Sequence, residues 1–154
     1  CVYVVSRDKD LEQLLSDRVR LFDPSKDTEM DVAALLAAKG YTPQQAVEVQ
    51  TLSGDSTDNI PGVPGIGPKT ASSIIQKYGN LERFLEEGQG EKSHQKISSL
   101  KEQAILSRKL AVIRRDAPLP ALSIEFLRYD GLPKEELAVY FDKLGFKSLT
   151  KRIE

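Results

Sequence analysis

The sequence predicts a mainly α-helical protein built around a helix–hairpin–helix, with a short α/β segment at its beginning. Three observations support this fold class. The chain opens with the strand-like run CVYVV, helix start and stop signals recur from residue 31 onward, and the glycine- and proline-rich stretch 61–67 separates two helical patterns. With 154 residues, 40% of them hydrophobic, the chain is long enough to bury a core.

Two short strands are expected near the beginning of the chain. Residues 1–5 are β-branched or aromatic without polar alternation, which is typical of a strand buried on both faces of a parallel sheet. Residues 18–23 (RVRLFD) are the second candidate. Because two short strands do not form a stable sheet alone and no methionine opens the chain, we expect a fragment of a larger α/β domain.

Three helices are expected before residue 53. Residues 8–17 place three leucines on one face, and residues 31–40 form a second helix that ends at a glycine. Thr42, Pro43 and Gln45 then have the spacing of a capping box, which predicts a helix through about Leu52.

From residue 60 onward only helices and turns are predicted. Pro68 begins a helix that ends at Gly79, and Asn80 caps a short helix that follows. Residues 90–110 predict one longer helix, and residues 114–123 a proline-rich loop. Pro133 begins a last helix that ends at Gly145, and its apolar side chains are expected to face inward: Leu137, Tyr140, Phe141 and Leu144.

Charge is unevenly distributed along the chain, although the formal net charge is only −1. Residues 1–60 hold 6 Lys and Arg against 11 Asp and Glu, whereas residues 61–115 hold 10 against 5. An acidic part followed by a basic part suits a protein that holds metal ions beside a phosphate backbone. Chance unevenness over solvated helices explains the same counts.

The stretch GVPGIGPKT, residues 62–70, has almost the spacing of a nucleotide-binding P-loop. Pro68 stands where the P-loop lysine belongs, moves Lys69 about 100° around the helix and removes an amide. The preceding residues also read as helix and turn rather than strand. An ATP site is therefore disfavoured.

A hairpin that binds backbone phosphate explains the same stretch better. Gly65 and Gly67 allow their amides and the start of the next helix to point outward together, where the helix dipole favours an anion. Such a loop binds a nucleic-acid backbone without reading its sequence. A turn that only joins two helices is the simpler alternative.

Four aspartates are candidate metal ligands. Asp8 and Asp10 follow the first strand, where sites assemble in parallel sheets. Asp55 and Asp58 are spaced so that a helical turn would place both carboxylates on one face. Carboxylates without His or Cys would select Mg²⁺ or Mn²⁺. Helix capping explains each pair separately, and it is the adjacent hairpin that favours a metal site.

These residues resemble a known family. SRDKDLEQLLSDRVRLFD, LSGDSTDNIPGVPGIGPKTA and LPKEELAVYFDKLGFKSLTKRI are similar to the 5′-nuclease domain of bacterial DNA polymerase I, a relative of flap endonucleases. The resemblance implies that residues 1–52 are the C-terminal remnant of an α/β nuclease core. Residues 53–154 would form the DNA-binding domain, in which the hairpin belongs to a helix–three-turn–helix.

The resemblance also implies roles for individual residues. Asp8, Asp10, Asp55 and Asp58 match metal ligands of the family, which uses two Mg²⁺ or Mn²⁺ ions. A K⁺ ion at the hairpin would bind backbone carbonyls of residues 62–67. The residues expected to bind double-stranded DNA are Gly62, Gly65, Gly67, Lys69, Thr70 and Lys77.

The function implied is structure-specific 5′→3′ exonuclease and flap endonuclease activity in DNA replication and repair. We expect a monomeric parent protein in the bacterial cytoplasm, associated with the nucleoid and without membrane contact. The family's other carboxylates and its helical arch lie outside this sequence, so we expect the fragment alone to be nearly inactive. The alternative is a non-catalytic helix–hairpin–helix module that only binds DNA.

Overall fold

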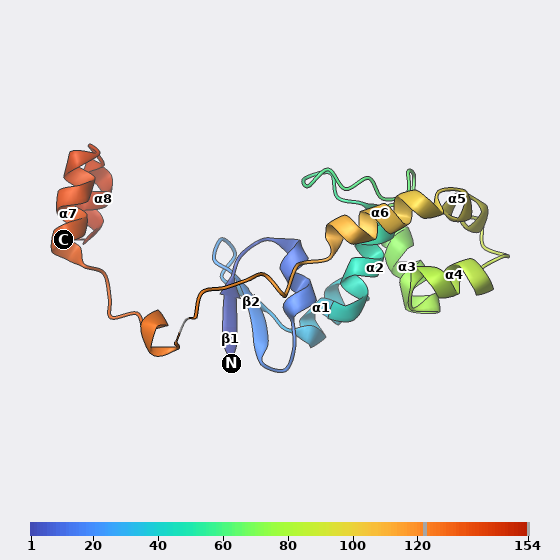
Figure 1. Cartoon of the computed structure of the whole chain (residues 1–154), viewed down its shortest axis with the longest axis horizontal. Helices are drawn as coiled ribbons and strands as arrows, with labels where there is room; N and C mark the ends of the chain where they lie inside the picture. The colour runs from blue at the N-terminus through green and yellow to red at the C-terminus, as the bar shows by residue number, and fades with distance from the viewer. Residues whose placement is uncertain (122, 154) are drawn as a thin grey trace. The chain divides into compact units, whose positions relative to one another are not determined.

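The computed structural model describes residues 1–121 and 123–153, which divide into two compact units, Cys1–Arg115 and Asp116–Glu154. Helices dominate, with one small sheet near the beginning of the chain (Figure 1). The predicted fold class is therefore confirmed. The boundary expected between residues 52 and 53 lies within the first unit and remains a prediction from the resemblance.

The sheet has three strands in the order β1–β2–β3. β1 (Val2–Val5) pairs parallel with β2 (Val19–Asp23), and β2 pairs antiparallel with β3 (Thr28–Met30). Both predicted strands are confirmed, whereas β3 was not foreseen because TEM is short and has no apolar alternation. Three of the four β1 residues are exposed, so the expected burial on both faces is not found within the described residues.

The segment between the first two strands is a helix as predicted, but it is a 3₁₀ helix, η1 (Lys9–Leu14), shorter than the predicted range of residues 8–17. Its buried Glu12 accepts hydrogen bonds from Lys39 and from the Tyr41 hydroxyl, the latter at 3.0 Å. Burial, followed by the neighbouring Glu12 charge, raises the pKa of Tyr41. These contacts attach η1 to the end of α1 (Val32–Lys39).

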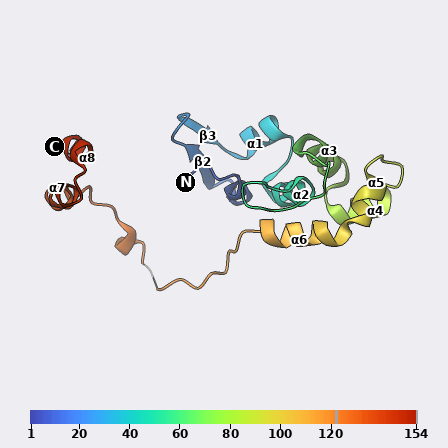
Figure 2. The same cartoon turned by 90° about the horizontal axis from the view of Figure 1, so that it is seen from above.

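Helix α2 (Pro43–Ser53) lies at the centre of the helical part. Its capping box of Thr42 and Gln45 is present as predicted. Contacts to α3 and α6 place α2 between those two helices (Figure 2). The helices that follow α2 in the first unit are α3 (Pro68–Tyr78), α4 (Leu81–Glu87), α5 (His94–Ser99) and α6 (Lys101–Ala111). Residues 90–110 therefore form two helices that meet at Leu100, not one.

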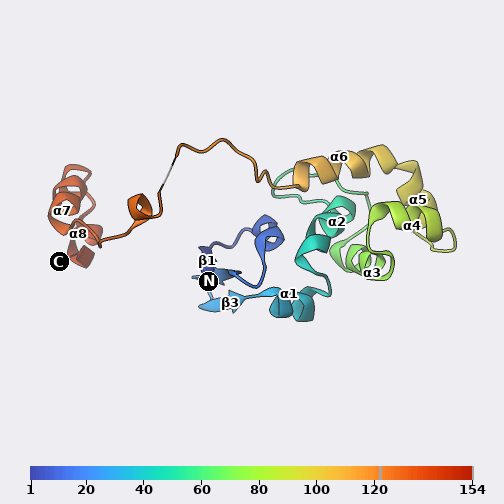
Figure 3. The same ribbon diagram turned by 60° about the horizontal axis from the view of Figure 1, so that its bottom comes forward.

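The first unit contains two hydrophobic clusters. The larger joins α2 to the later helices, and the smaller lies between the sheet and α1 (Figure 3). Fully buried members of the larger cluster are Leu52, Ala71, Ile75, Leu81, Phe84, Ile97 and Ala104. The smaller cluster consists of Leu15, Leu21 and Leu35. Partly buried Tyr41, which lies just before α2, packs against both clusters.

The second unit contains η2 (Glu125–Leu127), α7 (Lys134–Lys143) and α8 (Lys147–Ile153). Pro133 precedes α7 as predicted, but α8 was not foreseen. Phe141 packs against Phe146 at 6.4 Å between ring centroids. Tyr140 and Leu144, which were expected to face inward, are 57% and 46% exposed, so this part of the prediction is wrong for the described residues.

Candidate metal centre and nucleic-acid interface

Three of the four predicted aspartates come together. Carboxylate oxygens of Asp10, Asp55 and Asp58 all lie within 4.8 Å of one another. Asp55 is buried, Asp10 is half-buried and Asp58 is exposed, so the cluster opens to solvent on the side of Asp58. Side chains from two distant parts of the sequence thus form one acidic site.

The two ends of the cluster are fixed by different elements. Asp10 is the second residue of η1, which begins shortly after β1 ends. Asp55 forms an isolated antiparallel bridge with Ile60, with N–H···O distances of 2.8 and 2.7 Å, and this bridge closes the turn that holds Asp58. Asp55 and Asp58 share a face because of this closed turn, not because of the helical turn that the spacing predicted.

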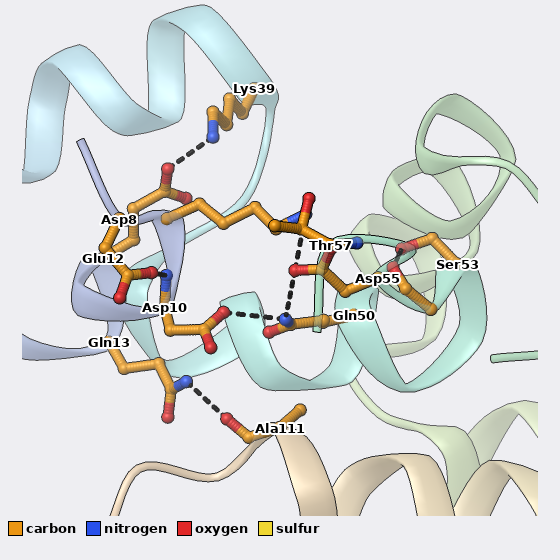
Figure 4. A network of polar contacts seen from close by, with 12 residues as sticks. Asp8, Asp10, Glu12, Gln13, Lys39, Gln50, Ser53, Asp55, Thr57 and Ala111 are labelled. Carbon is orange, nitrogen blue, oxygen red and sulfur yellow. Dashed lines mark hydrogen bonds and ion pairs between the residues drawn. The ribbon is translucent and has the colours of Figure 1, made fainter. Parts of the chain in front are cut away.

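Gln50 of α2 joins both halves of the cluster (Figure 4). Its Nε2 lies 2.7 Å from Asp10 Oδ1 and 3.3 Å from Asp55 Oδ2, and its side chain is buried. The amide therefore holds the two carboxylates side by side. Gln50 was not predicted as a site residue, because a glutamine within a helical pattern does not indicate that it will contact Asp10, which is distant in the sequence.

Lys9 places a positively charged side chain at this site, and it too was not predicted as a site residue. Its Nζ lies 2.7 Å from Asp55 Oδ2, and its side chain is 50% exposed, whereas that of Asp55 is 1% exposed. Burial acts to raise the pKa of Asp55, but hydrogen bonds from Lys9 and the Thr57 amide outweigh it and leave that pKa lowered. Loss of solvation and then the Asp55 charge raise the pKa of Asp58.

Asp8 has a different role from the other three aspartates. It is the N-cap of η1, and its Oδ1 accepts a hydrogen bond from the Asp10 amide at 3.0 Å. Asp8 does not belong to the group of carboxylates within 4.8 Å. Capping thus accounts for the observed contact of Asp8, which leaves its role as a ligand a prediction.

The carboxylates are suited to a hard divalent cation. The donors are oxygens only, and ions such as Mg²⁺ and Mn²⁺ prefer carboxylate and water oxygens. Asp10, Asp55 and Asp58 would hold the ion, and the exposed side of the cluster leaves room for water. The residues present therefore fit such an ion.

The hairpin follows the cluster directly and is fixed to it by two glycines. Gly54 and Gly62 have φ values of 68° and 58°, and a Cβ on Gly62 would lie 2.3 Å from the Gly54 nitrogen. Gly62 is buried, donates to Ser107 Oγ at 3.0 Å and accepts from Gln103 Nε2 at 2.8 Å. Gly62 therefore serves the packing of the hairpin on α6 rather than an outer surface, contrary to its expected contact with DNA.

The other side of the hairpin is open. Gly65 and Gly67 are exposed, as are Lys69 and Thr70 at the start of α3. No side chain caps α3 and Pro68 has no N–H, so the first amides that donate there are those of Lys69 and Thr70. Four of the six predicted DNA-binding residues thus share one exposed corner with an available helix N-terminus.

One further lysine lies at this corner, and another lies at the opposite end of α3. Lys77, in the last turn of α3, forms an ion pair with Glu91 at 2.6 Å and lies over the Tyr78 ring at 5.0 Å. Lys96 of α5 was not singled out from the sequence, yet its Nζ lies 2.7 Å from where a Cβ on Gly65 would be. Lys96 therefore adds positive charge at the hairpin, whereas the charge of Lys77 is partly neutralised.

Comparison with known proteins identifies the family. Residues 41–135 match the family described as 5′-3′ exonuclease, C-terminal SAM fold. The matched range includes α2, the hairpin and the helices from α3 to α6. The chain belongs to this 5′-3′ exonuclease family. Because the match begins at residue 41, it covers Asp55, Asp58 and the hairpin but not Asp8 or Asp10.

The chain is also similar to curated DNA polymerase I proteins over nearly its whole length. It is 41% identical to DNA polymerase I of Bacillus caldotenax and 39% identical to that of Bacillus subtilis, in each case over 99% of this chain and 18% of the relative. It is 36% identical to the thermostable DNA polymerase I of Thermus thermophilus, over 96% of this chain and 18% of that protein. The chain thus spans about a fifth of the length of these relatives.

Solved structures of T5 5′-exonuclease share its fold. A zinc-bound form has a TM-score of 0.64 at 26% identity, and the match covers 71% of this chain and 42% of that one. A bacteriophage T5 flap endonuclease in a complex with DNA and metal ions has a TM-score of 0.64 at 25% identity, with the same coverage. No helix among the described residues is both long enough and apolar enough to cross a bilayer.

Proposed function

We propose that this chain is part of the 5′-nuclease of a bacterial DNA polymerase I and acts in the cytoplasm on the 5′ end or flap of nicked DNA. The observation that carries the proposal is the group of three carboxylates within 4.8 Å directly beside an exposed glycine hairpin. Family membership and the metal- and DNA-bound T5 structures support it. In this proposal the parent protein works as a monomer.

The reaction is phosphodiester hydrolysis with Mg²⁺ or Mn²⁺, two ions being held in the full domain. Such ions supply a nucleophile from water and stabilise the charge that develops on the leaving oxygen. Asp8, Asp10, Asp55 and Asp58 would hold the ions on this chain, directly or through water. Because further ligands would come from the rest of the parent protein, the chain alone is expected to show almost no cleavage.

The hairpin positions the duplex by its phosphates. Exposed amides at the start of α3 and the Lys69 ammonium bind the backbone, with Gly65, Gly67 and Thr70 at the same corner. A K⁺ ion at the hairpin would use its free carbonyls. The carbonyls of Gly62, Val63 and Gly67 already accept hydrogen bonds, from Gln103, Ile66 and Ala71 respectively, so these three oxygens are less available to the ion.

Binding of Mn²⁺, measured by electron paramagnetic resonance, tests the metal centre. In Asp58→Asn one ligand of the cluster is lost, and we expect the chain to bind Mn²⁺ about tenfold more weakly or worse. Asp17→Asn is the matched control, since Asp17 is exposed and outside the cluster. Equal Mn²⁺ affinity in the wild type and Asp58→Asn would contradict the proposed centre.

A DNA-binding module without catalysis is the second candidate, favoured by the ion pair in which Lys9 already neutralises Asp55. Flap cleavage by the longer protein that contains this chain separates the two. The nuclease proposal expects Asp58→Asn to abolish cleavage in Mg²⁺ while duplex binding in EDTA is not weakened. Undiminished cleavage by that variant would remove Asp58 from the catalytic centre.

A further inference from the structure

The Asp55 carboxylate already accepts hydrogen bonds from three donors. Its Oδ2 accepts from Lys9 Nζ at 2.7 Å and from Gln50 Nε2 at 3.3 Å, and its Oδ1 accepts from the Thr57 amide at 2.9 Å. The carboxylate is 1% exposed, so solvent does not reach it freely. Oδ2 accepts two hydrogen bonds and Oδ1 accepts one, so an ion that binds through Oδ2 takes the place of Lys9 or Gln50 on that oxygen.

The three donors differ in how easily they can leave. The Thr57 amide belongs to the turn that the Asp55–Ile60 bridge closes, and Gln50 is buried on α2. Lys9 is half-exposed and carries its ammonium at the end of a flexible four-carbon stem. Its departure costs no backbone movement, and the charge it removes is replaced by that of the ion.

We propose that Lys9 is a built-in counter-cation, which neutralises Asp55 when no divalent ion is bound and is displaced when the ion binds. Gln50 keeps Asp10 and Asp55 aligned in both states. The inference deepens the proposed nuclease function, on which it rests, because it concerns the loading of the same centre.

The displaced ammonium has a place to go. Lys9 lines a hollow of about 530 Å³ whose wall also includes Lys39, Ser53 and Lys69. Lys69 is at the start of α3, beside the proposed phosphate-binding corner. Glu12 also lines this hollow and pairs with Lys39. An ammonium released into the hollow lies near Lys69, so metal loading both neutralises the carboxylates and frees a cation for backbone phosphate.

Mn²⁺ affinity of the chain tests the exchange. Lys9→Met removes the competing ammonium and should tighten Mn²⁺ binding about fivefold, the factor expected for an ion pair at a half-exposed position. Lys26→Met is the matched control. Lys26 pairs with Asp23 at 3.7 Å and is 75% exposed, so its loss removes the same charge without touching the cluster and should change the affinity much less.

Gln50→Leu should change the Mn²⁺ affinity in the opposite direction from Lys9→Met. Loss of the amide leaves Asp10 and Asp55 without their common donor, so Mn²⁺ binding should weaken in this variant. Tighter Mn²⁺ binding in Lys9→Met together with weaker Mn²⁺ binding in Gln50→Leu would support the two roles proposed, in which Lys9 competes with the ion and Gln50 aligns the carboxylates. Equal tightening in Lys9→Met and Lys26→Met would mean that only general charge matters, and it would overturn the exchange.

Chemical labelling of lysines gives a direct readout. Acetylation of Lys9, followed by mass spectrometry with Lys26 as internal reference, should accelerate when Mg²⁺ is added, because the ammonium leaves Asp55. In Asp55→Asn the acetylation should be fast without Mg²⁺ and unaffected by it. Unchanged Lys9 labelling in a wild-type chain that does bind Mn²⁺ overturns the exchange and leaves the metal centre standing, whereas absence of any Mn²⁺ binding overturns both.

Discussion

At the scale of single residues, the close contact of Gly54 with Gly62 attaches the hairpin to the metal centre. Asp55 immediately follows Gly54, and Val63 donates to the Leu52 carbonyl at 2.8 Å, so the end of α2 and the hairpin run side by side. Only glycine suits both positions, because each has a positive φ and neither has room for a Cβ. The site is thus assembled by backbone packing as well as by side chains.

Gly62→Ala tests this packing. The methyl group would lie 2.3 Å from the Gly54 nitrogen at a φ of 58°, and we expect the free energy of unfolding to fall by about 3 kcal/mol. Gly67→Ala is the control, since Gly67 has a φ of −84° and a methyl group there would meet no atom within 4 Å, so the change should stay within about 0.5 kcal/mol. Urea denaturation measures both; similar losses in the two variants would contradict the contact.

At the scale of elements, one arginine connects three helices. Arg108 of α6 donates to Glu48 of α2 at 2.9 Å and to Glu82 of α4 at 2.7 Å. Glu48 also accepts from the Leu81 amide at the start of α4, at 3.0 Å. The Arg108 side chain is 24% exposed, so this network is better shielded from solvent than an ordinary surface ion pair.

Arg108→Met should lower the free energy of unfolding by about 1 kcal/mol at pH 7, a value discounted because Glu82 is 54% exposed. The hydrogen bond from Arg108 lowers the pKa of Glu82. A lowered folded-state pKa stabilises the fold above the unfolded value of about 4.3, and this contribution is lost as the pH falls through the folded value. The stability difference between wild type and variant should therefore narrow below about pH 4.

Urea denaturation at pH 7 and at about pH 3 checks this dependence. Arg83→Met is the control, because Arg83 pairs with Glu87 within one exposed helix at 3.3 Å and should contribute less than about 0.5 kcal/mol. An undiminished difference for Arg108→Met at the lower pH would assign the effect to the aliphatic stem of Arg108 rather than to its charge.

How far the sequence predicted each element depended on whether the signal was local. The capping box of α2, the proline at the start of α3 and the asparagine before α4 are short-range patterns, and all were confirmed. The break at Leu100 and the strand β3 have no comparable signal. η1 was expected only as a helix over residues 8–17, because its leucine spacing does not distinguish a 3₁₀ helix from an α-helix.

In the candidate site too, residues with a local sequence signal were predicted and residues without one were not. Asp10, Asp55 and Asp58 were found because short motifs and a family resemblance identify them. Lys9 and Gln50 were missed, since their roles arise from contacts with Asp55 and Asp10 that only the folded chain creates. Gly62 was predicted to contact DNA but is buried in the structure, because the spacing of the glycines does not reveal which of them is buried.

At the scale of the whole molecule, the charge pattern follows the two parts of the site. The acidic residues 1–60 contribute the carboxylates, and the basic residues 61–115 contribute the corner that faces the proposed duplex. A phosphate backbone that reaches Lys69 therefore approaches a group of negative charges. Without a divalent ion these carboxylates repel the DNA, apart from the single charge that Lys9 neutralises.

Mg²⁺ should consequently strengthen DNA binding by this chain. The two equilibria are linked, so an ion that neutralises the carboxylates must raise the affinity for duplex by the same factor by which duplex raises the affinity for the ion. Fluorescence anisotropy with a nicked duplex, at constant ionic strength, should show about fivefold tighter binding in Mg²⁺ than in EDTA. In Asp55→Asn this difference should shrink, because that variant loses an ion ligand and leaves the Lys9 charge without its Asp55 partner. A wild-type affinity that is equal in Mg²⁺ and EDTA would mean that the hairpin and the carboxylates act on DNA independently.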